Sequence, residues 1–232
     1  MLKSAYVDLV RLLRIPAAKS GLLSGLERIG VDRRGARWLR SLFAIYDIED
    51  MAAIDLPWWT FAAITEADEF LRSRPNSRVF EYGSGASTVW LARRAGSVVS
   101  IEHDRDWHAV VCQRLSPYPN AIVKLIEPDT KRETGYLSEK GRWAGHSFRN
   151  YVTAIDQESD AFDLIIIDGR ARAACLTHAR ERLAPGGIIL FDNSNRQRYR
   201  TAIAASGMVR RRLAGLTACL PYPDETSILR LD

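Results

Sequence analysis

The sequence predicts an α/β protein with a seven-stranded, mostly parallel sheet and a closing antiparallel strand, preceded by an N-terminal helical extension. From residue 78 onward, short apolar runs alternate with stretches of helical periodicity. Apolar runs of this kind are typical of parallel strands that are covered on both faces. The glycine turn Gly83-Ser84-Gly85 separates the first run from the helical stretch after it, and glycine turns sharply because it has no Cβ atom.

The composition fits one α/β domain with an extension. The 232 residues include 33 Lys and Arg against 28 Asp and Glu, for a net charge of +5. We expect the helical extension over residues 1–56 and the α/β domain over residues 57–232. No apolar run approaches the ~20 residues that cross a bilayer. Cys112, Cys175 and Cys219 form no C-x-x-C pair and no early signal-peptide pattern is present, which favours a reducing, cytoplasmic location.

The first forty residues carry an excess of positive charge. Nine Lys or Arg residues stand against Asp8, Glu27 and Asp32 in this segment. A basic amphipathic arm can approach an anionic membrane or nucleic acid. Its apolar residues also recur at a helical spacing that fits packing on the domain or on a second subunit. These residues are Leu2, Tyr6, Leu9, Leu12 and Leu13 in the first helix, and Trp38, Leu42, Ile45 and Tyr46 in a later one. The predicted partners are peripheral membrane contact or a homo-oligomer, with nucleic acid disfavoured.

Proline, glycine and capping residues set the elements of the first half. Pro16 is expected to end the first helix and Pro57 to start another, with Trp58 and Trp59 near a substrate pocket. Asp104 can cap a further helix. The predicted elements are a helix over residues 57–72, a strand over 78–82, a helix over 86–95, and strands over 98–101 and 121–126.

The second half begins with a long polar connection, residues 127–160, which has a helix near 148–157 and the length of a functional lid. Its residues expected to contact an organic acceptor are Tyr136, Trp143, His146 and Tyr151. The later predicted elements are strands over 162–167 and 188–191, a helix over 170–184 ended by Pro185-Gly186-Gly187, a helix over 201–206, and an antiparallel pair over 208–213 and 226–231.

The segment from Val79 to Asp104 predicts a nucleoside-cofactor site. It reads VFEYGSGASTVWLARRAGSVVSIEHD: a strand, a glycine turn, a helix, and a second strand that ends in Glu102. The N-terminal amides of the helix face the turn. A carboxylate at the end of the second strand can accept hydrogen bonds from both hydroxyls of a ribose. Together these features indicate a βαβ unit that binds a nucleoside.

The same segment distinguishes between cofactors. A nicotinamide-binding turn has the pattern G-x-G-x-x-G, whose third glycine lets the helix and strand pack closely around a pyrophosphate. The third position here is Thr88. Glu81 precedes the first glycine by two residues, where a carboxylate would repel a pyrophosphate but suits the ammonium end of an amino-acid cofactor. S-adenosylmethionine has such an end and carries no phosphate.

These residues resemble the first motif of the class I S-adenosylmethionine-dependent methyltransferases, which is an acidic residue, any residue, Gly, any residue, Gly. The stretch FEYGSGAST matches it. Residues 162–195, FDLIIIDGRARAACLTHARERLAPGGIILFDNSN, resemble the family's fourth strand, helix, Pro-Gly-Gly turn and fifth strand. The resemblance implies a Rossmann-like fold that binds S-adenosylmethionine. The expected cofactor-binding residues are Glu81, Gly83, Ser84, Gly85, Ser87, Glu102, His103 and Asp168.

Oxygen-bearing side chains at two neighbouring strand ends predict a metal site. Asp168 ends the fourth strand, and Asp192 and Asn193 end the fifth. Such ligands suit Mg²⁺, which could bind an acceptor hydroxyl and favour its ionised form. The pattern resembles that of the metal-dependent catechol and caffeoyl-coenzyme A O-methyltransferases, although these have a lysine where this chain has Ala171. Alternatively, Asp168 only borders the cofactor, and Asn193 or Ser194 caps the next helix.

The acceptor is only weakly encoded in the sequence. After the fourth strand the chain reads Asp168-Gly169-Arg170-Ala171, unlike the Asn/Asp-Pro-Pro-aromatic sequence with which the family's base-amine methyltransferases hold a planar amino group. This favours O-methylation of a small molecule or a saccharide. Asp168 and His146 are the candidate catalytic residues, because histidine can exchange a proton at neutral pH. Two alternatives stay open: an NAD(P)-dependent oxidoreductase, and a non-catalytic nucleoside-cofactor-binding interaction module.

Overall fold

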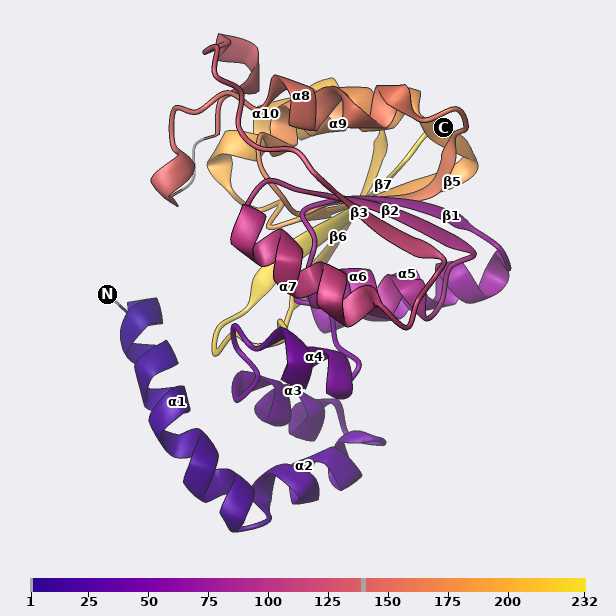
Figure 1. Ribbon diagram of the computed structural model, residues 1–232. Coiled ribbons are helices and arrows are strands. Elements are labelled where there is room, and N and C mark those ends of the chain that lie inside the picture. Colours follow the sequence, from indigo (N-terminus) through magenta and orange to yellow (C-terminus); the bar gives the residue numbers. More distant parts are fainter. Residues whose placement is uncertain (1, 139–140) are drawn as a thin grey trace.

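The computed structural model describes residues 2–138 and 141–232 and contains the predicted sheet (Figure 1). Its seven strands lie in the order β3-β2-β1-β4-β5-β7-β6. β1 pairs in parallel with β2 and β4, whereas β7 runs antiparallel between β5 and β6. The winding therefore reverses between β1 and β4. Parallel α/β sheets open a ligand crevice at this point, outside the carboxyl ends of the strands.

Strands and helices alternate after four N-terminal helices. The strands are β1 (Arg78–Tyr82), β2 (Ser97–Glu102), β3 (Ala121–Leu125), β4 (Phe162–Ile167), β5 (Leu183–Asp192), β6 (Val209–Gly215) and β7 (Asp224–Arg230). The α-helices are α1 (Leu2–Lys19), α2 (Leu22–Gly30), α3 (Arg34–Leu42), α4 (Ile48–Ala53), α5 (Phe61–Ser73), α6 (Ala86–Ala92), α7 (Arg105–Leu115), α8 (Arg149–Val152), α9 (Arg172–Glu181) and α10 (Gln197–Ala205). Short 3-10 turns cover Thr134–Tyr136, Gly141–Trp143 and Thr153–Gln157.

Two apolar cores lie on opposite faces of the sheet. α5, α6 and α7 cover one face, with the N-terminal helices beyond them, and α8, α9 and α10 cover the other (Figure 1). On the first face the rings of Trp59 and Trp90 meet edge to face, with their centroids 5.8 Å apart. On the second, Phe80 and Phe162 meet at 5.2 Å. β1 and β4 are buried almost throughout because both of their faces are covered.

The N-terminal helices share the first of these cores. Val7 and Val10 of α1 are buried in the same cluster as residues of α5 and α6. Trp38 Nε1 of α3 donates a hydrogen bond to the carbonyl of Leu220, 2.9 Å away near the other end of the chain. One core therefore crosses the boundary expected at residue 56. The division into residues 1–56 and 57–232 stays a prediction. Within the described ranges, no helix is long and apolar enough to span a bilayer.

Several element boundaries differ from the sequence prediction: α9 and α10 cover Arg172–Glu181 and Gln197–Ala205 rather than residues 170–184 and 201–206, α6 ends at Ala92, and only Arg149–Val152 of the predicted helix near 148–157 is α-helical. Three further differences have a local cause. α1 continues through Pro16 to Lys19, since the carbonyl that proline leaves without a donor lies on an exposed turn where water can bond to it. α5 begins at Phe61 because Thr60 is its N-cap, with Oγ1 accepting from the Ala63 N–H at 3.3 Å. β5 begins at Leu183, which pairs with Phe162, and so includes the glycine turn that was predicted to precede it.

Candidate active site

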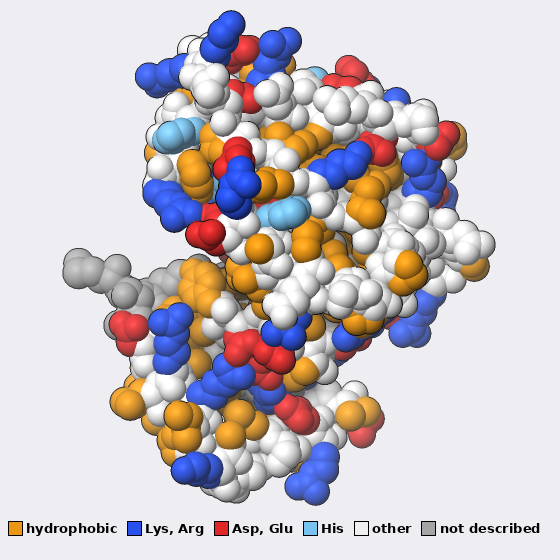
Figure 2. Space-filling model, in the orientation of Figure 1, with side chains coloured by type: hydrophobic (Ala, Val, Ile, Leu, Met, Phe, Trp, Pro, Cys, Tyr) orange, Lys and Arg blue, Asp and Glu red, His pale blue; other side chains and the backbone are white. Residues whose placement is uncertain are grey.

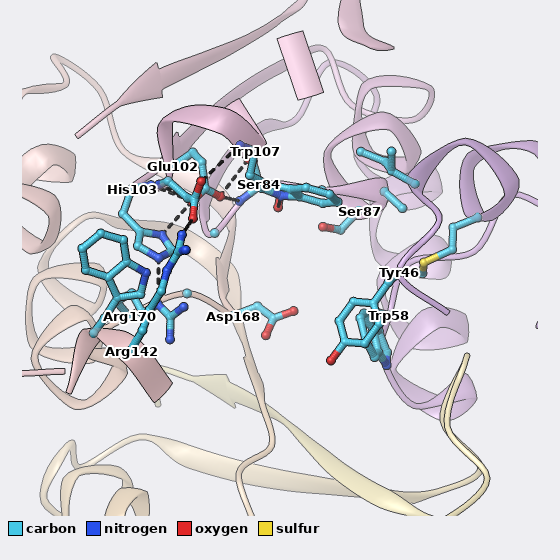
Figure 3. Close-up of a pocket in the computed structure, with 18 residues that line it drawn as sticks. Tyr46, Trp58, Ser84, Ser87, Glu102, His103, Trp107, Arg142, Asp168 and Arg170 are labelled. Carbon is cyan, nitrogen blue, oxygen red and sulfur yellow. Dashed lines mark hydrogen bonds and ion pairs between the residues drawn. The ribbon is translucent and has the colours of Figure 1, made fainter. Parts of the chain in front are cut away.

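Two adjoining cavities open at the carboxyl ends of the central strands. The larger has a volume of about 480 Å³ and the smaller about 160 Å³. Tyr46, Trp58 and Asp168 line both cavities, so the two spaces meet at these side chains (Figure 3). The larger volume lies in the range of roughly 300–1,000 Å³ that small-molecule sites occupy.

The glycine turn allows β1 and β4 to approach each other closely. Gly83 has a φ of 98°, and a Cβ atom at this position would lie 2.7 Å from the Cα of Gly169. The N–H of Gly83 donates to the carbonyl of Ile101, and that of Asp168 donates to the carbonyl of Tyr82, both at 3.0 Å. A larger residue at position 83 would therefore separate the two strand ends and deform the floor of the larger cavity.

Glu81 is fully buried beneath the turn and accepts three hydroxyl hydrogen bonds. Its donors are Ser87 Oγ at 2.5 Å, Thr88 Oγ1 at 2.6 Å and Ser100 Oγ at 2.8 Å. Burial raises the pKa of Glu81 to about 7, although the three donors oppose this. Thr88 Oγ1 also accepts from the N–H of Gly85 at 2.9 Å, so it ties the turn to Glu81. The Glu81 carboxylate lies outside the lining of the larger cavity, and its contact with the cofactor stays a prediction.

Glu102 places an ionised carboxylate in the larger cavity at the end of β2. Its Oε1 accepts from the N–H groups of His103 (2.7 Å) and Asp104 (2.9 Å). Its Oε2 accepts from the N–H (3.3 Å) and Oγ (3.0 Å) of Ser84. Burial alone would raise the pKa of Glu102, but the contacts with His103 and the N–H of Asp104 hold it below its usual value. The carboxylate therefore stands as a charged acceptor in the place expected for ribose recognition.

The wall beside Glu102 is built partly by the long connection after β3. Arg142 pairs with Asp104 at the start of α7, and its guanidinium lies over the Trp143 ring, 5.0 Å from the centroid. Trp143 in turn contacts the ring of His103 at 5.5 Å. His103 Nε2 accepts from Arg170 Nε at 2.9 Å, which links this wall to the end of β4 (Figure 3).

A buried arginine organises the ends of β4 and β5. The side chain of Arg172 is only 1% exposed. Its Nε donates to Gly169 O at 3.1 Å, its Nη1 to Asp192 O at 2.6 Å and Asn193 Oδ1 at 3.3 Å, and its Nη2 to Asp168 O and Oδ1, each at 2.6 Å. A guanidinium has five N–H groups, so each of them has an oxygen acceptor here.

Asp168 has one carboxylate oxygen held by the protein and one open. Oδ1 accepts from Arg172, whereas Oδ2 has no donor in the part of the chain that the structure describes. The side chain is 23% exposed and points into the space between the glycine turn and Trp58 (Figure 3). A free carboxylate oxygen in this position can accept a hydrogen bond or a proton from a bound molecule.

The structure does not support the magnesium site predicted at Asp168, Asp192 and Asn193. The three residues do come together, but they surround Arg172, whose guanidinium already binds oxygens of all three. Two unit charges 4 Å apart interact by about 4 kcal/mol at an effective dielectric constant of 20, and a divalent ion would double the repulsion. Within residues 2–138 and 141–232, no group of three or more His, Cys, Asp or Glu is arranged to hold a metal ion.

Asp192 is buried beside the same guanidinium. Its Oδ1 accepts from Thr226 Oγ1 at 2.8 Å, and its Oδ2 lies 3.7 Å from Arg172 Nη1. Burial, followed by the charge of Asp168, raises the pKa of Asp192 to about 7, with Arg172 and Thr226 opposing the rise.

Asn193 and Ser194 do not cap α10, contrary to the alternative prediction, because the helix begins after Arg196. Asn193 Nδ2 donates instead to Asp224 at 2.9 Å, and Ser194 Oγ donates to Glu225 at 2.9 Å. Both side chains therefore connect the end of β5 to β7.

His146 lies outside the site, so the structure does not support its predicted catalytic role. It is exposed, its ring packs on Trp143 at 5.4 Å, and it is not among the described residues that line either cavity. Tyr151 is fully buried, and Tyr136 packs against the core under α8 and α9. Of the residues that the connection was expected to contribute, only Trp143 lines the larger cavity.

Aromatic residues from the N-terminal segment complete the junction. The rings of Tyr46 and Trp58 meet edge to face at 5.1 Å, opposite Asp168 (Figure 3). Trp58 was a predicted pocket residue, whereas Trp59 is fully buried in the core. Tyr46 was missed because its helical spacing indicated packing, and its left-handed backbone, with a φ of 59°, turns it toward the cavity.

Comparison with known proteins bears on the class of the protein. A family model described as a methyltransferase domain matches residues 80–194, a range that includes the glycine turn, Glu102, Asp168 and Arg172. A search of curated proteins found no match. The family match agrees with the cofactor that the glycine turn and Glu81 predicted.

Solved structures show the same fold. An rRNA methylase from Streptococcus thermophilus is 13% identical, with 73% of this chain and 96% of the other covered and a TM-score of 0.52. A methyltransferase-like protein from Silicibacter pomeroyi is 21% identical, with 75% and 90% covered and a TM-score of 0.50. A Streptococcus mutans protein described as a methyltransferase, in complex with SAH, is 14% identical, with 72% and 97% covered and a TM-score of 0.50. At these identities the likeness shows the fold alone.

The strand order, the glycine turn and the family match together define a methyltransferase domain of the class I, Rossmann-like type. The matched domain, residues 80–194, places the chain among the S-adenosylmethionine-dependent methyltransferases, as an enzyme of that class. The nicotinamide-dependent and non-catalytic alternatives are therefore set aside.

Proposed function

We propose that the protein transfers a methyl group from S-adenosylmethionine to a hydroxyl oxygen of a small-molecule or saccharide acceptor in the smaller cavity. The observation that carries this proposal is the open oxygen of Asp168. Oδ2 accepts no hydrogen bond from the described residues and belongs to a side chain that lines both cavities. A single carboxylate thus borders both the space for the cofactor and the space for the acceptor.

The larger cavity suits S-adenosylmethionine. Glu102 offers charged oxygens to the two ribose hydroxyls, and Gly83 leaves room for a close approach to the turn. The predicted cofactor-binding residues that line this cavity are Gly83, Ser84, Gly85, Ser87, Glu102, His103 and Asp168. When bound, S-adenosylmethionine supplies a methyl group that its sulfonium charge already activates. The protein then has to orient the acceptor and take its proton.

Asp168 is the proposed proton acceptor. The acceptor oxygen forms a bond to the methyl carbon while the carbon–sulfur bond breaks and leaves its electron pair on sulfur. The hydroxyl proton passes to Asp168 Oδ2, and the products are a methyl ether and S-adenosylhomocysteine. Arg172 keeps Oδ1 occupied, so Oδ2 is the oxygen available for this proton.

The smaller cavity sets the size of the acceptor. Its volume of about 160 Å³ is close to the roughly 150 Å³ of an engineered cavity that binds benzene, so one ring with small substituents fits. Tyr46, Trp58 and Tyr222 offer aromatic surface, while Asp168 and Asn193 offer polar groups, which suits a hydroxylated ring. The rRNA methylase among the similar structures makes RNA the alternative acceptor.

The test is methyl transfer from isotope-labelled S-adenosylmethionine to a panel of phenols, monosaccharides, hydroxy acids and RNA. We expect the label on oxygen of a single-ring compound. Asp168→Asn should lower kcat by about 10²–10⁴-fold, as loss of a general base does, while its affinity for S-adenosylhomocysteine stays within a few fold of the parent. Labelling of RNA alone, or of nitrogen alone, would overturn this acceptor assignment.

A separate proposal concerns the outer face of α1, which we infer to contact an anionic membrane surface. Leu12 and Ile15 are 74% and 65% exposed, and Arg11 and Lys19 are exposed on the same helix. Figure 2 shows hydrophobic side chains intermixed with basic and acidic ones over the N-terminal helices, in the lower part of the molecule. Lipid surfaces with negative headgroups attract this combination. A second copy bound through the same face would bring like charges together.

Vesicle co-sedimentation tests this surface. We expect binding to vesicles that contain phosphatidylglycerol, weaker binding to phosphatidylcholine alone, and loss of binding in the double variant Leu12→Ser, Ile15→Ser. Val209→Ser is the matched control, because Val209 is 54% exposed on β6, away from this face. A dimeric mass in light scattering that the double variant abolishes would assign the face to a second copy of the chain instead.

A further inference from the structure

We propose that Arg172 is the built-in cation of this active site: it takes the place predicted for a metal ion and positions Asp168 so that Oδ2 faces the acceptor. This inference uses the role of Asp168 from the proposed function. The placement of Arg172 itself does not depend on which acceptor is methylated. Arg172 is a positioning residue, because its N–H groups are used by protein oxygens.

The hydrogen bonds of Arg172 fix Asp168 at two points. Nη2 donates to both the backbone carbonyl and Oδ1 of Asp168, each at 2.6 Å, so the carboxylate cannot turn without losing a bond. Nη1 holds Asp192 O and Asn193 Oδ1 on the neighbouring strand. The planar guanidinium therefore sets the spacing of the two strand ends as well as the direction of Oδ2.

The guanidinium is enclosed on all sides by the protein and cannot adopt another position. Its side chain is 1% exposed and is enclosed by the ends of β4 and β5, with the Tyr199 ring 5.9 Å away. Ala171, which precedes it, has a left-handed backbone with φ 44°, an uncommon conformation for a non-glycine residue. That conformation starts α9 with Arg172 directed back at the strand ends. A metal ion would need the same oxygens as ligands and would have to displace Arg172 from them.

A titration with Mn²⁺ tests the inference without any methyl acceptor. The bound ion is measured by the loss of the electron paramagnetic resonance signal of free Mn²⁺. We expect no saturable Mn²⁺ site in the wild-type protein. Arg172→Ala should gain a site for one ion, because it uncovers the oxygens of Asp168, Asp192 and Asn193. Arg170→Ala is the matched control and should gain none, since Arg170 Nε donates to His103 rather than to these oxygens.

Each outcome of the Mn²⁺ experiment decides the inference. One saturable ion in the wild type that Asp192→Asn removes would overturn it. A folded Arg172→Ala protein that binds no Mn²⁺ would overturn the claim that the arginine occupies a place fit for a metal ion. If Arg172→Ala does not fold, the wild-type titration decides alone.

The positioning role is tested on an acceptor found by the methylation panel. Wild-type turnover should be unchanged by EDTA and by added Mg²⁺. Arg172→Lys should lower kcat at least tenfold while KM for S-adenosylmethionine stays within about twofold, because an ammonium cannot match the planar fork. Wild-type kcat in Arg172→Lys would overturn the role. Failure of the proposed function would appear instead as no methylated hydroxyl, with the Mn²⁺ results unaffected.

Discussion

Two pairs of carboxylates at neighbouring strand ends are held in different ways. Glu81 and Glu102, beside the glycine turn, accept mainly from hydroxyl and backbone N–H groups. Asp168 and Asp192, at the ends of β4 and β5, face the buried guanidinium of Arg172. The first arrangement spreads its support over several hydroxyl and N–H donors, with the His103 ring nitrogen 2.6 Å from Glu102 Oε1, and the second concentrates its support in one cation.

The difference suits the roles proposed for the two cavities, the larger for the cofactor and the smaller for the acceptor. A hydroxyl donor such as Ser84 Oγ can rotate away from Glu102 when a ribose hydroxyl takes its place, so neutral donors suit a carboxylate that must bind a ligand. The Arg172 guanidinium has no free N–H and is enclosed, which suits a carboxylate whose direction must stay fixed. Each neutral hydrogen bond is worth about 0.5–1.5 kcal/mol, whereas removing one partner of a buried ion pair costs about 3–5 kcal/mol.

The largest effect is expected at Arg172. Arg172→Met keeps much of the side-chain volume but leaves Asp168 and Asp192 without their cation, so we expect a loss of about 3–5 kcal/mol in the free energy of unfolding, measured by urea denaturation. Arg200→Met is the control, because Arg200 is exposed on α10 and should change stability by less than about 0.5 kcal/mol. If the two variants were equally stable, Asp168 and Asp192 would not depend on the cation of Arg172, and the contrast with Glu81 and Glu102 would be wrong.

The next effect is a pH dependence at Glu81. Its pKa is about 7 in the folded protein against an ordinary value of 4.5. As pH rises, the unfolded chain loses this proton first, so the contribution of Glu81 to stability falls between about pH 4.5 and pH 7 and is constant above. Because one pKa unit corresponds to about 1.4 kcal/mol, Glu81→Gln should gain on the order of 3 kcal/mol relative to the parent between pH 4.5 and pH 8.

Urea denaturation at several pH values measures this effect. The three hydroxyls around Glu81 can rotate to accept from the Gln amide, so the variant should fold. The exposed Glu127→Gln provides the control, and its stability should follow that of the parent at every pH. Parallel pH profiles for Glu81→Gln and the parent would show that Glu81 is ionised in both states.

The third effect is on cofactor affinity. Glu102→Gln removes the charge that we expect to accept the ribose hydroxyls but keeps one oxygen, so binding of S-adenosylhomocysteine should weaken about tenfold, since hydrogen bonds to charged groups are worth roughly 1.5–3 kcal/mol. Isothermal titration calorimetry measures it, with Glu127→Gln as the unaffected control. An unchanged dissociation constant in Glu102→Gln would place the ribose elsewhere.

The arrangement of the proposed cofactor half could be predicted from the sequence because its parts are local. Gly83, Gly85 and Glu102 lie within one βαβ unit, and the parallel pairing of β1 with β2 brings them to the same edge of the sheet. What the sequence could not show is the packing beneath the turn. Thr88 looked like a departure from a nicotinamide pattern, whereas in the structure its hydroxyl joins Gly85 to Glu81.

The acceptor half was predicted in its carboxylates but not in its cation. Asp168, Asp192 and Asn193 were placed together correctly, because they end adjacent parallel strands. The direction of Arg172 depends on the left-handed backbone of Ala171, which no residue type signals. Tyr46 was missed for the same reason, and His146 was favoured for its chemistry although its loop places it outside both cavities.

The smallest effect is expected at His146. Its substitution distinguishes a proton acceptor at the end of β4 from one on the long connection. His146→Ala should leave kcat and KM within about twofold of the parent, because the exposed ring touches Trp143 and not the cavities. Its stability should change by less than about 0.5 kcal/mol, as is usual for exposed positions. Asp168→Asn, assayed on the same acceptor, shows the loss that a true proton acceptor produces. If His146→Ala instead lost turnover tenfold or more and added imidazole restored it, His146 would be the proton acceptor. Asp168 would then have only its proposed role beside the cofactor.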